Sequence, residues 1–129
     1  MTLTSIYHVI GLMSGSSLDG LDLALCRFEK KNEQWNFEII VAETFAYSTT
    51  LQQKLATLHL SSAKELMQQD AELAKLWATM VKDFTAKNKI EEVDFIASHG
   101  HTIFHEPQNN FTTQIGNGAA IAALTGIST

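Results

Sequence analysis

The sequence is poor in residues that would cross-link or interrupt a fold, with one cysteine and one proline among 129 residues. A lone Cys26 cannot form a disulfide within the chain, so the sequence suits a reducing compartment, and this residue is expected to be a packing residue. No stretch reaches the roughly 18 apolar residues of a membrane-spanning helix. Residues 1–11 lack the basic flank and small-residue cleavage site of a secretory signal. These absences predict a cytoplasmic globular protein with no membrane partner.

Basic residues are also scarce. Nine Lys and Arg against fourteen Asp and Glu give a formal net charge of −5, and the basic residues form no stripe interleaved with aromatic residues. This charge pattern argues against a nucleic-acid partner. An acidic protein can still bind phosphate groups, but it then uses backbone N–H groups or a bound metal ion.

Apolar residues, by contrast, make up 45% of the chain. Their alternation predicts strands over residues 6–13, 21–28 and 35–47, with a polar turn over residues 30–34. The second strand is apolar on both faces, which predicts that both faces are covered. Three consecutive strands joined by turns predict an antiparallel meander.

The apolar spacing then changes to that of helices. Residues 49–52 and 62–65 each match the capping box that begins a helix. The second box is followed by an apolar stripe that includes Trp77 and extends to a stop at Asn88, and this stripe is expected to be core. A short strand over residues 93–97 and a short helix over 119–124 complete the order.

Asn117 and Gly126 are the expected cap and end of that last helix. A strand–helix–strand order implies a right-handed crossover onto the same sheet. The sequence therefore predicts one α/β domain over residues 1–129, with a mixed sheet opened by a three-stranded meander.

Three segments could carry chemistry, and the first is the bend between the first two strands. Gly15 and Gly20 are expected to allow close backbone approach and backbone conformations closed to other residues, while Ser14, Ser16 and Ser17 offer hydroxyl groups. Asp19 would repel a phosphate unless it holds Mg²⁺ through water or hydrogen-bonds the turn. The residues alone leave an anion-binding loop and an ordinary Asx-type turn equally open.

The second segment, residues 98–107, contains three histidines. His99 and His101 are two residues apart on an extended segment and are expected to point to the same side, as two metal ligands would. The alternative is a loop at a strand end whose histidines hydrogen-bond a polar substrate. The third segment, residues 114–118, places Asn117 between two glycines at a helix start, where N–H groups can face an oxygen-rich ligand.

Three pieces of the sequence, in this order, closely resemble the N-terminal part of the anhydro-N-acetylmuramic acid kinases. They are GLMSGSSLDGLDLAL, ASHGHTIFHEP and TTQIGNGAAIAALTGI. The resemblance spans essentially the whole chain but only about the first third of such a kinase. It implies a half-domain of the ribonuclease H-like actin/Hsp70/sugar-kinase fold. It also implies ATP- and Mg²⁺-dependent opening of the 1,6-anhydro ring with phosphorylation of O6, in peptidoglycan recycling.

The resemblance also implies residue roles. Asp19 would lie near Mg²⁺ and bind the metal through water. The residues that would bind the ATP phosphates are Gly15, Ser16, Ser17, Leu18, Asp19, Gly20, Leu21 and Asp22. The residues that would bind the amino sugar are His99, His101, Thr102, His105, Gln114 and Asn117.

Three positions depart from the family pattern. Ser16 stands where Thr is usual and keeps the hydroxyl, His101 replaces an expected Gln, and Asn117 replaces a frequent Asp. The general base and the second ATP-binding half are expected beyond Thr129. The resemblance therefore implies a truncated N-terminal portion with no catalytic residue of its own, inactive by itself because phosphoryl transfer depends on positioning.

Two other functions stay open. In the first, the chain is a binding module that pairs with a complementary C-terminal chain or forms a homo-oligomer through apolar surface left exposed. In the second, it is a small metal-dependent hydrolase that uses His99, His101 and His105.

Overall fold

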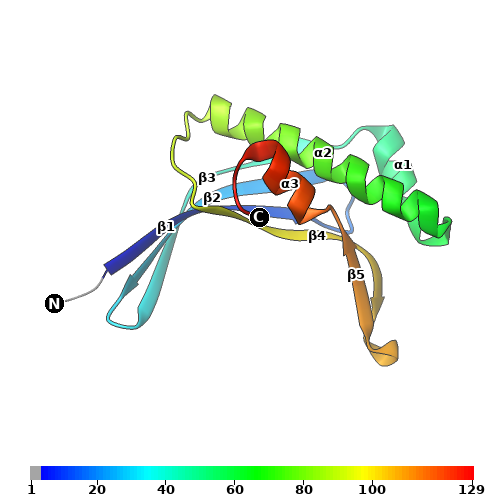
Figure 1. Cartoon of the computed structure of the whole chain (residues 1–129), viewed down its shortest axis with the longest axis horizontal. Helices are drawn as coiled ribbons and strands as arrows, with labels where there is room; N and C mark the ends of the chain where they lie inside the picture. The colour runs from blue at the N-terminus through cyan, green and yellow to red at the C-terminus, as the bar shows by residue number, and fades with distance from the viewer. Residues whose placement is uncertain (1–3) are drawn as a thin grey trace.

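The computed structural model describes residues 4–129, which form one mixed sheet covered by helices (Figure 1). The five strands lie in the order β3-β2-β1-β4-β5. They are β1 (Thr4–Ser14), β2 (Gly20–Lys31), β3 (Gln34–Ala46), β4 (Phe95–Glu106) and β5 (Phe111–Ile115). The first three form an antiparallel meander, β4 is parallel to β1, and β5 is antiparallel to β4. The predicted α/β class and meander are confirmed.

Three α-helices connect and follow these strands. They are α1 (Thr49–Thr57), α2 (Ala63–Lys87) and α3 (Gly118–Thr125), with short 3₁₀ turns at Leu58–Leu60 and Pro107–Asn109. Ser62 and Glu65 form the predicted capping box of α2, and Asn88 ends that helix. Asn117 and Gly126 cap α3 as predicted.

The box predicted at residues 49–52 is wrong by one residue. The residue that caps α1 is Ser48, whose extended backbone lets its Oγ accept a hydrogen bond from the Leu51 N–H. Because Ser48 Oγ already accepts from an N–H of the first turn, Thr49 is not needed as the cap and becomes the first residue of the helix.

The core lies between one face of the sheet and the helices, all of which Figure 1 shows on the same side. Leu21 and Leu23 of β2 are fully buried there, as are Trp77 and Phe84 of α2 and Ile121 of α3. The predicted α2 stripe is therefore core. Burying each such side chain stabilises the fold by roughly 1.5–3 kcal/mol.

The opposite face of the sheet is open, and here the expectation for β2 is wrong. On this face Cys26 and Phe28 are only half-buried and border an open cavity, because no element within residues 4–129 packs over them. Trp35 and Phe37 of β3 beside them are 54% and 70% exposed. Tyr7 lies with its ring centroid 6.1 Å from that of Trp35. We use the name open-face patch for half-buried Phe28 together with the exposed side chains Tyr7, Trp35, Phe37, Ile39 and Phe95.

The strand β4 runs much further than the predicted residues 93–97, and the segment expected as a loop continues as strand. It contains a bulge, since Leu12 pairs with Ser98 but Ser14 pairs with His101, with Gly100 at φ 77° between them. The strand β5 was missed because its five residues carry no apolar alternation. The β4–β5 hairpin forms an arm that extends away from the body of the sheet (Figure 1).

Candidate functional site

The structure brings the three predicted segments, except the end of the second one at His105, together at one end of the sheet. The β1–β2 loop follows Ser14, the middle of β4 pairs with the end of β1, and the β5–α3 turn follows β5. Three cavities lie among them. Their volumes are about 860, 430 and 310 Å³. The first two cavities share Ser98 and His99, whereas the third, which Ser16 and His101 border, lies on the helical side of the sheet.

The left-handed residue of the β1–β2 loop is a leucine rather than one of its glycines. Leu18 has φ 61°, a left-handed conformation that is unusual for a branched side chain, and its N–H donates to the Gly15 carbonyl at 3.2 Å. The Leu18 side chain packs against the core, which offsets this strain. Gly15 and Gly20 do not have positive φ, so the expectation that they supply unusual backbone angles is wrong.

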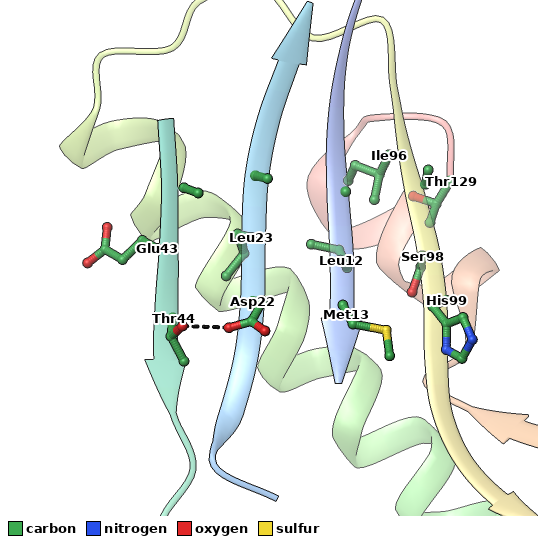
Figure 2. Close-up of a pocket in the computed structure, with 14 residues that line it drawn as sticks. Leu12, Met13, Asp22, Leu23, Glu43, Thr44, Ile96, Ser98, His99 and Thr129 are labelled. Carbon is green, nitrogen blue, oxygen red and sulfur yellow. Dashed lines mark hydrogen bonds between the residues drawn. The ribbon is translucent and has the colours of Figure 1, made fainter. Parts of the chain in front are cut away.

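The two carboxylates of the loop lie in different surroundings. Asp19 is exposed, and its main-chain carbonyl accepts a 2.9 Å hydrogen bond from the Tyr47 N–H, which fixes the loop to the end of β3. Asp22 accepts a hydrogen bond from Thr44 and borders the 860 Å³ cavity. Figure 2 shows Asp22 and His99 on opposite walls of this cavity, with Met13 between them.

The two central histidines do not share a side, contrary to the prediction. The bulge at Gly100 adds one residue, so His99 lies on the open face while His101 lies among the buried side chains beneath β1. Residues 4–129 contain no group of three or more His, Cys, Asp or Glu side chains that could hold a metal ion. A histidine-ligated metal centre of the predicted kind is therefore not formed by this part of the chain.

A buried chain of hydrogen bonds connects the loop, α2 and β4. The Trp77 Nε1–H donates to Tyr47 Oη at 2.9 Å, and the Tyr47 hydroxyl donates to Ser14 Oγ at 2.8 Å. Ser14 Oγ lies 2.9 Å from Nδ1 of His101. Burial raises the pKa of Tyr47 despite opposing hydrogen bonds to Ser14 and Trp77, so its hydroxyl stays protonated.

Burial also acts on the imidazole at the end of this chain. His101 is 3% exposed, and desolvation lowers its pKa, against a smaller opposing effect of the Ser14 carbonyl. The ring is therefore neutral at neutral pH. A neutral imidazole has one N–H donor and one acceptor nitrogen, which makes its tautomer important for what it can bind.

The β5–α3 turn joins the site through main-chain contacts. The Gly116 N–H donates to Asp70 on α2 at 2.7 Å, and Gly116 lies against the Trp77 ring. Asn117 and His99 border the 430 Å³ cavity. Gln114 donates to Thr102 Oγ1 at 3.3 Å, so the two segments predicted to contact substrate touch each other.

Six of the predicted site residues line none of the three cavities: Gly15, Ser17, Asp19, Gly20, Leu21 and His105. His105 pairs with Thr112 on the exposed arm, and the Leu21 side chain is fully buried in the core. Sequence reasoning missed Tyr47 and Asp70, which hold the loop and the β5–α3 turn. Neither carries a sequence signal, because a tyrosine before a capped helix and an acid within a helix are both ordinary.

Comparisons with known proteins agree on one family. The family model described as anhydro-N-acetylmuramic acid kinase matches residues 7–129. Curated relatives of that name include proteins from Acaryochloris marina, 37% identical over 95% of this chain, and from Pasteurella multocida, 36% identical over 95%. A third, from Colwellia psychrerythraea, is 38% identical over 93%. The chain spans about a third of the length of these relatives, 34%, 33% and 32% respectively.

Proposed function

The chain belongs to the anhydro-N-acetylmuramic acid kinase family, and from this premise we propose that it forms part of an ATP-dependent kinase site for an anhydro amino sugar. Its mixed sheet is that of a sugar-kinase half-domain. The observation that carries the proposal is the buried contact between Ser14 and His101, since it joins the β1–β2 loop to the β4 segment. The reaction would be opening of the 1,6-anhydro ring with phosphorylation of O6, within cytoplasmic peptidoglycan recycling.

In this proposal the β1–β2 loop binds the phosphates of ATP. The exposed hydroxyls of Ser16 and Ser17 and the adjacent backbone would contact phosphate oxygens, as expected for an acidic protein without a lysine cluster. Asp19 is exposed at the same loop and fits the usual mode of Mg²⁺, which takes one or two carboxylates plus phosphates and water. When bound, the ion would neutralise charge on the transferring phosphate.

The sugar would bind on the other wall of the site. The two larger cavities are bordered by His99, Gln114 and Asn117. Gln114 also hydrogen-bonds Thr102 across the β4–β5 pair. Side chains that can both donate and accept suit the hydroxyl and amide groups of an amino sugar. A polypeptide of residues 1–129 is not expected to phosphorylate the sugar alone, because its relatives are about three times as long.

Replacing Asp19 with asparagine is expected to weaken MgATP binding by the 129-residue polypeptide about tenfold, since the variant loses a charged Mg²⁺ ligand. Isothermal titration with MgATP, and with ATP plus EDTA, measures this effect. Asp83→Asn, which removes an exposed carboxylate from α2, is the matched control and should leave the affinity unchanged. Equal affinities for MgATP and metal-free ATP in the unaltered chain would contradict the role of Asp19.

The open-face patch supports a second proposal, that this half-domain pairs with further polypeptide, either a complementary chain or a second copy. Phe37 and Ile39 are 70% and 57% exposed within a continuous apolar surface, which is typical of an interaction face. Sedimentation velocity of the 129-residue polypeptide should show concentration-dependent association that Phe37→Glu reduces. Leu60→Glu, at a residue 78% exposed on the helical side, should not reduce it. A monodisperse monomer at high concentration would refute pairing between copies.

A further inference from the structure

We propose that Trp77, Tyr47 and Ser14 form a directional hydrogen-bond chain that fixes His101 as its Nε2–H tautomer and so presents an N–H donor to a ligand oxygen. Ser14, Tyr47 and Trp77 are positioning residues, since they act through His101. The inference rests on the proposed function only for the identity of the ligand. The tautomer itself follows from the hydrogen bonds that link Trp77, Tyr47, Ser14 and His101.

The direction of the chain is set at its tryptophan end. An indole nitrogen can only donate, so the Tyr47 oxygen accepts from Trp77 at 2.9 Å, and its own proton is left to point elsewhere. That proton goes to Ser14 Oγ, 2.8 Å away. Ser14 Oγ therefore accepts from Tyr47 and has its own proton available for another acceptor.

The acceptor for that proton is Nδ1 of His101. The two atoms are 2.9 Å apart and both residues are buried, so no water competes freely for the contact. The Ser14 carbonyl also lies near Nδ1, at the longer distance of 3.3 Å, and it would favour a proton on that nitrogen. The shorter contact and the fixed direction of the chain favour Nδ1 as acceptor.

The remaining ring nitrogen is the one that a ligand can use. Burial keeps the imidazole neutral, so with Nδ1 accepting, its single proton lies on Nε2. His101 borders the 310 Å³ cavity together with Ser16 and Leu18 of the loop and Thr102 of β4. The ligand atom must therefore be an acceptor, either a sugar oxygen or a phosphate oxygen, because both belong to the proposed function.

The same chain fixes the relative positions of the site's three segments. Ser14 is the last residue of β1 and accepts from the Tyr47 hydroxyl. The Tyr47 N–H donates to the main chain of the β1–β2 loop. The Trp77 ring lies against Gly116 of the β5–α3 turn. A displacement of any one segment would lengthen a buried hydrogen bond. A buried polar group without a partner costs about 1–3 kcal/mol, so the arrangement resists such displacement.

Nuclear magnetic resonance of the histidine side-chain nitrogens in the ligand-free chain tests the tautomer directly. Above the pKa of His101, its signals, assigned with His101→Gln, should be those of the Nε2–H form. Ser14→Ala removes the donor to Nδ1 and leaves the carbonyl, so the population should shift toward the Nδ1–H form. Tyr47→Phe frees Ser14 Oγ to accept from Nδ1 and should give a mixture of tautomers.

Matched controls keep this test specific. Ser5→Ala changes an exposed serine of the same strand, and Tyr7→Phe removes a tyrosine hydroxyl from the open-face patch, so neither should change the His101 signals. Should Ser14→Ala not fold, Tyr47→Phe decides the question. An Nδ1–H tautomer in the unaltered chain, or unchanged signals in the folded variants, would overturn the inference.

The ligand is tested with two separate probes, 1,6-anhydro-N-acetylmuramic acid and MgATP. The probe that accepts from Nε2 should shift the Nε2–H proton signal, and Ser14→Ala should bind it about tenfold more weakly, the effect of one hydrogen bond. A shift with the sugar assigns a sugar oxygen, and one with MgATP assigns a phosphate oxygen. Binding that leaves His101 unchanged overturns the donor role alone, whereas failure of both probes to bind counts against the proposed function as well.

Discussion

Gly116→Ala is expected to lower the free energy of unfolding by about 4 kcal/mol, the sum of overpacking and backbone strain. An added Cβ would lie 2.2 Å from Cζ3 of Trp77, and Gly116 has φ 104°, a conformation closed to alanine. Trp77 is fully buried and hydrogen-bonded to Tyr47, so its ring cannot move aside. Urea denaturation followed by tryptophan fluorescence measures the loss.

Gly126→Ala is the matched control for this change. Gly126 also has positive φ, 75°, but no heavy atom lies within 4 Å of the position of the new Cβ. It should cost only the backbone strain, about 1 kcal/mol. Equal losses in the two variants would show that contact with Trp77 does not matter, and would contradict the packing of the β5–α3 turn described above.

Gly20→Ala is expected to destabilise the protein by about 3 kcal/mol and to displace the β1–β2 loop. Its Cβ would lie 2.1 Å from the carbonyl oxygen of Phe45 and 2.8 Å from the carbonyl carbon, which are main-chain atoms of the paired strand. The strands must separate at this point, because a main chain cannot rotate away as a side chain can. Thermal unfolding and hydrogen exchange of the Tyr47 N–H, which binds Asp19, both report the change.

The neighbouring glycine provides the comparison. At Gly15 the nearest atom to an added Cβ is Ser17 Oγ, 4.0 Å away, and its φ is not positive. Gly15→Ala should change the free energy of unfolding by no more than about 0.5 kcal/mol, as most surface substitutions do. A larger loss at Gly15 than at Gly20 would mean that the loop does depend on unusual backbone angles at its first glycine.

Local patterns were sufficient to predict most elements of the fold. Period-two apolar spacing located the meander, and the stripe around Trp77 with its box at Ser62 located α2, because each signal lies within a few residues. Coverage of the sheet was mispredicted, since Cys26 and Phe28 are apolar whether or not another element packs over them. The short β5 was missed because its pairing with β4 depends on distant residues.

The site was predictable in composition but not in arrangement. The motifs placed Ser16, Asp19, His99 and Gln114 in three segments, and the structure brings those segments to one end of the sheet. The bulge that separates His99 from His101 was not predictable, because strand alternation assumes an unbroken register. Tyr47 and Trp77 joined the site through contacts between residues 30 or more apart in the chain.

The bulge at Gly100 also determines which kinds of sequence change β4 can accept. Deleting Gly100 would remove the extra residue and restore strict alternation, and the residues that follow would keep the sides they now occupy. His101 would still pair with Ser14, on the face opposite to His99. The bulge therefore gives this segment one residue of spare length: a deletion at Gly100 keeps His101 on the buried side, whereas an inserted residue needs a second bulge to do so.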